Sequence, residues 1–154
     1  MRPGITVYGI EPGQTLRAHC ADLRPAMSLV SRVSFVKRIR AGERISYSLS
    51  HTFERDTTVA TVPIGYADGV PRGLANERGL VLVRGKRRDI VGVVTMDQLM
   101  VDCGNDDVRV GDDAVLIGAQ GPHRITVTDW ADRLGTIDYE VTCGISSRVE
   151  RRRS

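Results

Sequence analysis

Two tyrosines and an aspartate stand where strand-like segments give way to turns, and their types and positions are suited to chemistry. Tyr47 follows the apolar Ile45 in a short strand-like run, and Tyr66 and Asp68 lie in the segment Gly-Tyr-Ala-Asp-Gly. Loops at strand ends commonly display binding and catalytic groups on a rigid scaffold, and a positioned phenol can act as a general acid or base. Taken alone, these residues favour a plainer interpretation, in which an amphipathic tyrosine packs its ring and leaves its hydroxyl at the surface.

The composition is that of an ordinary globular protein of one domain, residues 1–154. It is 41% hydrophobic and 27% charged, and no apolar run approaches the ~20 residues of a membrane helix, so no membrane partner is expected. The first residues lack the basic-then-apolar layout of a secretory leader. Three cysteines, an odd number without metal-binding spacing, predict no metal site and a reducing, cytoplasmic location; they are Cys20, Cys103 and Cys143.

The end of the chain is basic. The net charge is +3, and Arg148 and residues 151–153 carry much of the excess. A basic tail can contact nucleic acid, but no aromatic side chains alternate with these arginines to stack on bases. The solvated end of a last strand, over residues 147–152, is therefore the favoured interpretation, and nucleic acid is not an expected partner.

Closely spaced strands separated by turn signals organise the chain. Apolar and β-branched residues with a period of two predict strands, over residues 26–39, 44–48, 57–66, 80–83, 87–94, 96–102 and 114–117. Pro63 indicates an edge or a bulge, and short strands are also expected within residues 2–9. Eight or nine such strands predict an all-β fold, a closed or partly open β-barrel.

One or two short helices are expected near the C-terminus. Thr126 can cap the first, with Asp129 three residues on as an acidic form of the capping box. Gly135 then ends that helix. Thr136 can cap a second short turn that runs through Glu140.

Seven segments, in this order and at these separations, resemble one family. They are Arg-Pro-Gly-Ile at 2–5 with Tyr-Gly at 8–9, Pro-Ala-Met at 25–27, Gly42 with Ser-Tyr at 46–47, Pro-Ile-Gly-Tyr-Ala-Asp-Gly at 63–69, Gly92 with Met-Asp-Gln at 96–98, Gly-Asp at 111–112, and Thr-Ile-Asp-Tyr-Glu at 136–140. Over essentially its whole length, the chain resembles the C-terminal domain of bacterial alanine racemase, a fold-type III pyridoxal 5′-phosphate enzyme.

The resemblance implies a mostly β domain that follows an N-terminal (β/α)₈ barrel. That barrel carries the lysine that forms a Schiff base with pyridoxal 5′-phosphate. Arg2 matches a position at the end of the barrel's last strand, so we expect one domain of a longer enzyme, inactive alone, rather than a stand-alone protein. The family forms head-to-tail homodimers that interconvert L- and D-alanine for peptidoglycan precursors. By motif position, Tyr47 is the second base and reaches the partner subunit's site, because the two faces of the substrate need two proton carriers.

Further roles carry over by motif position. Arg2 corresponds to an arginine that donates to the cofactor's pyridine nitrogen, which stays unprotonated because a guanidinium only donates. The cofactor phosphate is implied to meet the backbone amides of Gly4 and Ile5 and the phenol of Tyr139, and glycine permits such close approach. The other implied positions concern substrate: the Met96 backbone N–H on its carboxylate, and the access channel lined by Tyr66, Arg72 and Ile137.

The sequence departs from the family pattern beside the implied base. Ser48 stands where the family usually has glycine, which predicts a disturbance of the backbone that aims Tyr47. His51 or Phe53 stands near a family aromatic position. Val93 replaces a basic residue of the channel, a change that alters the charge there more than the chemistry.

The residues leave other functions open. A dimerisation or interaction module without chemistry of its own, and a basic-tailed barrel that binds nucleic acid, both suit a small β domain. Among enzymes, a racemase of serine or of several amino acids shares the two-domain plan, as does a decarboxylase relative. Met-Asp-Gln at 96–98 together with Thr-Ile-Asp-Tyr-Glu at 136–140 points to alanine racemase.

Overall fold

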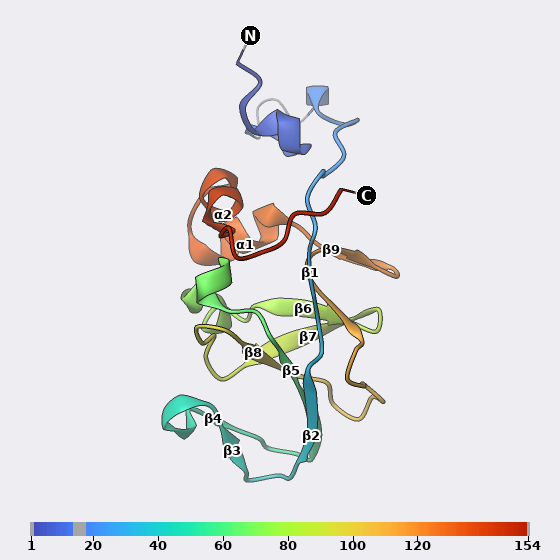
Figure 1. Ribbon diagram of the computed structural model, residues 1–154, viewed down its shortest axis with the longest axis vertical. Helices are drawn as coiled ribbons and strands as arrows, with labels where there is room; N and C mark the ends of the chain where they lie inside the picture. Colours follow the sequence, from blue (N-terminus) through green and yellow to red (C-terminus); the bar gives the residue numbers. More distant parts are fainter. Residues whose placement is uncertain (1, 14–17, 154) are drawn as a thin grey trace.

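A computed structural model describes residues 2–13 and 18–153, and strands dominate them. Eight strands form one antiparallel sheet in the order β1-β9-β6-β7-β8-β5-β2, with β10 paired to β9 (Figure 1). The strands of this sheet are β1 (Leu29–Arg32), β2 (Phe35–Ile39), β5 (Thr57–Val62), β6 (Leu80–Val83), β7 (Lys86–Val91), β8 (Leu99–Asp102), β9 (Asp113–Gln120) and β10 (His123–Ile125). The mainly β prediction is confirmed, with one large antiparallel sheet.

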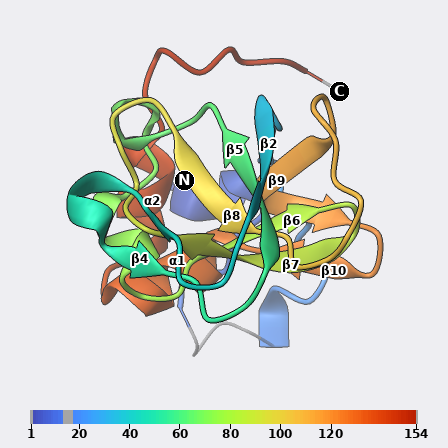
Figure 2. The ribbon, with the colours of Figure 1, turned by 90° about the horizontal axis from the view of Figure 1, so that it is seen from below.

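Shorter elements connect and flank the sheet. A two-stranded ladder joins β3 (Arg44–Ile45) to β4 (His51–Thr52). The 3-10 helices are η1 (Gly4–Tyr8), η3 (Tyr47–Leu49), η4 (Tyr66–Asp68) and η5 (Arg72–Ala75), and the α-helices are α1 (Val127–Leu134) and α2 (Asp138–Gly144). Figure 2, seen from the β3–β4 end, shows both α-helices to one side of the strands.

The sheet begins and ends on one bent run of chain. β1 pairs with β9, whereas β2, which begins after Val33 and Ser34, pairs with β5. At the bend, the Val33 N–H donates to the Asp112 carbonyl and the Ser34 N–H donates to the Thr61 carbonyl, each at 2.9 Å. The sheet therefore curls until its edges meet on this run. Among the described residues no ladder joins β1 to β2, so a closed barrel is not observed.

The bend corrects the prediction of one continuous strand over residues 26–39. Leu29, Val33 and Ile39 are buried, as the period of two predicts, but Phe35 is exposed. Side chains alternate between the faces of a strand only while the strand continues without interruption. The bend at Val33 and Ser34 breaks the alternation, and Phe35 points away from the core.

The core lies inside the curled sheet and continues to α1. Its fully buried side chains come from strands far apart in sequence and include Val62, Leu82, Leu99, Leu116 and Trp130. A smaller cluster of Ile39, Phe53, Val59 and Val91 packs against the partly buried Ile45 of β3. The β3–β4 hairpin is therefore anchored to the sheet through apolar contacts of its own.

The first helix follows its predicted capping pattern. The Asp129 N–H donates to the Thr126 hydroxyl at 3.0 Å, and the Thr126 N–H donates to the Asp129 carboxylate at 2.7 Å. Gly135 ends α1 in the left-handed conformation. The cap predicted for the second helix is wrong, because Ile137 is its N-cap, and the Thr136 hydroxyl donates to the Glu140 carboxylate instead.

Three predicted strands are corrected by local chemistry. Residues 4–8 form η1, not strands, between Pro3 at the N-cap and the left-handed Gly9. β5 stops at Val62, because Pro63 has no N–H to donate to a ladder. No strand forms over residues 147–152 of the described chain. There the Arg151 guanidinium donates to the Val149 carbonyl, inside the predicted strand, and to the carbonyls of Ile145 and Ser146 just before it.

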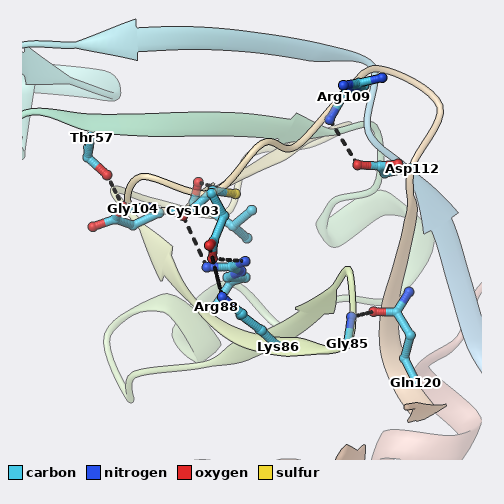
Figure 3. A network of polar contacts seen from close by, with 12 residues as sticks. Thr57, Gly85, Lys86, Arg88, Cys103, Gly104, Arg109, Asp112 and Gln120 are labelled. Atoms are coloured by element: carbon cyan, nitrogen blue, oxygen red, sulfur yellow. Dashed lines mark hydrogen bonds and ion pairs between the residues drawn. The ribbon is translucent and has the colours of Figure 1, made fainter.

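A buried arginine ties β7 to the loop after β8 (Figure 3). Arg88 is only 8% exposed, and its guanidinium donates to the Cys103 carbonyl at 3.1 Å and to the Asp106 carboxylate at 2.5 Å. Lys86 donates to the same carboxylate at 2.8 Å. The hydrogen bonds from Lys86 and Arg88 hold the pKa of Asp106 below its usual range. An ionised Asp106 thus compensates a cation that would be costly to bury alone.

Within residues 2–13 and 18–153, no helix is long and apolar enough to cross a membrane. The same residues bring together no group of His, Cys, Asp and Glu side chains that suits a metal ion. The cysteines are free thiols. Burial raises the pKa of the Cys103 thiol to about 11, which keeps it protonated and unreactive at neutral pH.

Asp106→Asn should lower the thermal midpoint by several degrees, because the buried Arg88 then has no anionic partner. The neighbouring Asp107→Asn is the matched control, since Asp107 pairs with the exposed Arg109. The folded-state pKa of Asp106 is lowered, so its contribution is complete at neutral pH. It is lost as pH falls through the range in which the carboxylate takes up a proton. Equal midpoints for the two variants in thermal unfolding at pH 7 would contradict this account.

Candidate functional site

Tyr47 lies on a loop at one end of the molecule. It begins η3, between β3 and β4, and its side chain is 73% exposed. The β3–β4 hairpin and η1 lie at opposite ends of the long axis (Figure 1). The phenol therefore faces outward, at the end of the molecule remote from residues 2–9.

The backbone around Tyr47 is held in an uncommon conformation. Ser46, Ser48 and Leu49 have φ of 73°, 56° and 51°, in the left-handed region that costs residues other than glycine about 1 kcal/mol or more. The Ser46 hydroxyl accepts a hydrogen bond from the Val93 N–H at 3.0 Å. A Cβ on Gly92 would lie 2.5 Å from the Cβ of Ser46. The loop is thus fixed against the end of β7, where only glycine leaves enough room.

The turn that carries Tyr66 lies against the turn that carries Met96. The Tyr66 N–H donates to the Thr95 carbonyl at 2.9 Å, and the Ala67 N–H donates to the Met96 carbonyl at 3.0 Å. The Tyr66 and Met96 side chains are both exposed. The structure therefore brings two of the predicted substrate residues together on one surface, through their backbones.

The N-terminal segment and α2 form a second meeting point. Gly4 has φ of 59°, and a Cβ built there would lie 3.6 Å from the Tyr139 hydroxyl. Ile5 buries its side chain, while Arg2 is exposed. Ile137 and Tyr139 line a groove of about 940 Å³ whose other walls come from residues 8–13, β9 and α1. The backbone of Gly4 and the phenol of Tyr139 are thus presented together.

The start of α2 also reaches the Tyr66 turn. Tyr66, Thr136 and Glu140 line a smaller cavity of about 380 Å³, and Arg72 is exposed at the start of η5 beside it in sequence. Burial raises the pKa of Asp138, although the Thr128 hydroxyl donates to it at 3.1 Å and opposes the shift. Ile137 and Tyr66 therefore lie on neighbouring surfaces.

The predicted residues fall into three places. Gly4, Ile5, Ile137 and Tyr139 gather around η1 and α2; the Tyr66 and Met96 turns touch; and Tyr47 stands at the far end. Sequence reasoning missed three polar residues that hold these turns, namely Ser46, Asp97 and Arg148, and it singled out Asp68 for chemistry without finding its contacts. Ser46 is adjacent to Tyr47, but nothing in the local sequence marks the contact of Arg148 with Asp68 and Asp97.

Comparison with known sequences decides the family. The profile of the family described as "Alanine racemase, C-terminal domain" matches residues 26–153. The chain belongs to this family. It is 51% identical to the alanine racemase of Cutibacterium acnes and 50% identical to that of Symbiobacterium thermophilum, in each case over 152 residues and 98% of this chain. It spans 40% of the length of both relatives.

Solved structures agree with this assignment to the alanine racemase C-terminal domain. The alanine racemase from E. faecalis superposes with a TM-score of 0.88 at 42% identity, over 95% of this chain and 38% of that one. The alanine racemase of Bacillus anthracis with bound L-Ala-P gives the same TM-score of 0.88 and 42% identity, over 95% of this chain and 37% of that one. This chain therefore has the fold of one domain of those larger proteins.

Ser48→Gly in this domain should raise the free energy of unfolding by about 1 kcal/mol, because glycine relieves the left-handed strain at φ 56°. Ser50→Gly is the matched control. Ser50 has φ of −69°, so glycine there only adds freedom to the unfolded chain and should cost about 0.5 kcal/mol. Urea unfolding followed by the fluorescence of Trp130 measures both. A Ser48→Gly variant no more stable than Ser50→Gly would refute the strain.

Proposed function

We propose that this chain is the C-terminal domain of a pyridoxal 5′-phosphate-dependent alanine racemase that interconverts L- and D-alanine. The observation that carries the proposal is the match of 98% of the chain to alanine racemases, at 51% identity to that of Cutibacterium acnes. Within that match, Tyr47 stands exposed on a loop fixed by Ser46 and Gly92. D-alanine made by such an enzyme would serve peptidoglycan precursor synthesis.

The residues around η1 suit the phosphate of the proposed cofactor. Gly4 and Ile5 begin a 3-10 helix, and the first amides of a helix have no acceptor within it. The Tyr139 hydroxyl, close to the Gly4 backbone, adds a donor. The Arg2 guanidinium, which can only donate, would hold an unprotonated pyridine nitrogen. When bound, pyridoxal 5′-phosphate acidifies the α-hydrogen of an amino acid.

Tyr47 is proposed as the second proton carrier, and the first is a lysine of the barrel domain. Racemisation takes a proton from one face of the α-carbon and returns one to the other, so two carriers on opposite faces are needed. η1, which carries Gly4 and Ile5, and the β3–β4 hairpin, which carries Tyr47, lie at opposite ends of the domain (Figure 1). This separation supports an arrangement in which Arg2, Gly4, Ile5 and Tyr139 serve one active site and Tyr47 serves the partner subunit's site.

Substrate contacts are proposed for the paired turns. The Met96 backbone N–H would meet the carboxylate of alanine, and Tyr66 would line the route to it together with Arg72 and Ile137. All four residues are exposed, which suits groups that contact a ligand or a partner. Val93 gives the route less positive charge than a basic residue at that position would.

The proposed partners are the barrel domain and a second copy of the enzyme. Exposed apolar side chains at Tyr8, Ile137 and Tyr139 border the 940 Å³ groove and suit a covered surface, and the neighbouring Val7 is exposed as well. We also propose a cytoplasmic location, which suits three free thiols. The bent β1–β2 run supports describing the sheet as a partly open barrel.

A dimerisation module without chemistry is the second candidate, and the same exposed apolar residues favour it. Binding of nucleic acid has less support, because Arg148 and Arg152 of the basic tail already pair with carboxylates. Loss of activity on removal of a single hydroxyl separates the enzyme from the module.

Tyr47→Phe in the natural gene product should lower kcat for alanine racemisation by roughly 10² to 10⁴-fold, the usual contribution of a positioned acid or base. Cofactor absorbance and thermal midpoint should not change. Tyr8→Phe is the matched control and should keep full activity. Coupled detection of D-alanine gives kcat and KM. A Tyr47→Phe variant with normal kcat would remove the proposed role.

The purified 154-residue chain with added pyridoxal 5′-phosphate should give no measurable racemisation. The lysine is proposed to lie in the barrel domain, so this chain supplies only one of the two proton carriers. Polarimetry of L-alanine over a day is a sufficient test, with an intact alanine racemase as positive control. Turnover by this chain alone would contradict the division of labour.

A further inference from the structure

The Tyr66 and Met96 turns form one unit because a glycine lets their backbones touch. A Cβ on Gly65 would lie 2.2 Å from the Thr95 carbonyl oxygen and 2.4 Å from the Met96 carbonyl oxygen. Such distances are well inside van der Waals contact, so only glycine fits. The two backbone hydrogen bonds between these turns depend on this approach.

Arg148 connects the acidic side chains of the same two turns. Its Nη2 lies 2.6 Å from Oδ1 of Asp97, and its Nε lies 3.3 Å from Oδ1 of Asp68. The other oxygen of Asp68 accepts the Gly65 N–H at 2.9 Å. The Ser146 N–H donates to the Asp68 carbonyl at 3.0 Å, which fixes the backbone just before Arg148. One guanidinium thus bridges two turns that are far apart in sequence.

The chemistry of the bridge requires arginine. Asp68 and Asp97 carry like charges on adjoining turns and repel each other unless a cation lies between them. A guanidinium offers several donors in a rigid plane and can reach two carboxylates at once, whereas a lysine ammonium is a single point charge. A guanidinium is charged at physiological pH, and the hydrogen bond to Asp97 and the nearby charge of Asp68 raise the pKa of Arg148 further.

The bridge should fix the relative position of the two turns more than it raises the free energy of unfolding. Arg148 and Asp97 are both more than half exposed, and ion pairs at such sites contribute little to folding. Asp68 is different, because its side chain is only 13% exposed and also holds the Gly65 N–H. The pull of Arg148 on Asp68 therefore bears directly on the start of η4, which carries Tyr66.

We propose that Arg148 is a positioning residue that holds the Tyr66 and Met96 turns in fixed relation, so that the Met96 amide and the Tyr66 ring face the substrate together. This inference rests on the proposed function, because the site that Arg148 would support is the proposed substrate site of the racemase. Arg148 itself does not need to touch the substrate.

Hydrogen exchange in the natural gene product tests the bridge itself. In Arg148→Met, the Tyr66 and Ala67 amides should exchange about tenfold faster or more, because their acceptors on the other turn are less firmly held. Arg148→Lys should give an intermediate rate. Arg152→Met is the matched control, since Arg152 pairs with Glu150 in the same tail, and its Tyr66 and Ala67 amides should exchange as in the wild type. Unchanged exchange in Arg148→Met would overturn the proposal.

Steady-state kinetics test the consequence for substrate. The Met96 amide is proposed to hold the alanine carboxylate throughout the reaction, so loosening it should raise KM roughly tenfold while kcat changes much less. A merely structural role would lower the thermal midpoint and the active fraction without raising KM.

Faster exchange with an unchanged KM would overturn the positioning role. A wild type without alanine racemisation would instead refute the proposed function, and exchange would still decide whether the bridge holds the turns.

Discussion

The bend at Val33 and Ser34 is the constraint on which the rest of the structure depends. The chain on one side of it pairs with β9 and on the other side with β5, so the sheet curls around a single core instead of lying open. Turns at both ends of the curled sheet are then attached to one scaffold. The Tyr47 loop and η1 keep a fixed separation along the long axis (Figure 1), which the proposed service to two active sites would require.

Close approach at glycine sets the turns on that scaffold. At Gly65 the obstacle to a side chain is backbone, and at Gly92 it is the Ser46 side chain. Backbone contacts of this kind leave little freedom, because carbonyl groups cannot change rotamer to make room. Ser48 is an exception to the use of glycine at these positions. It holds the left-handed conformation without being glycine, so the contacts around it must outweigh local strain.

Local patterns explain which parts of the fold the sequence predicts. The ends of α1 are predictable because Thr126, Asp129 and Gly135 act within a few residues of each other. The predicted strand over residues 147–152 does not form, and Arg151 there binds the Val149 carbonyl and the carbonyls of Ile145 and Ser146 just before it. Periodicity carries no information about such side-chain contacts. The predicted burial of Phe35 is wrong for a similar reason, because the bend before it is set by the partner strands β5 and β9.

The same distinction applies to the candidate site. Motif positions mark Gly4 and Tyr139, and the structure brings the backbone of one beside the hydroxyl of the other, although their role stays a prediction. Contacts between distant polar side chains have no comparable mark. Arg148 reaches Asp97 across 51 residues of sequence, and neither residue belongs to a pattern that pairs them. Only the folded chain reveals such a pair.

Several arginines make structural contacts that the charge distribution along the sequence does not predict. A net charge of +3 with a basic tail favours a solvated end of the chain. Instead Arg88 is buried against Asp106, Arg148 bridges two turns, and Arg151 binds backbone carbonyls. Arg88 and Arg148 each join separate segments through one planar cation with several donors, whereas Arg151 binds carbonyls of its own segment. The charged tail is therefore part of the fold, and it holds the surface on which we propose that substrate is recognised.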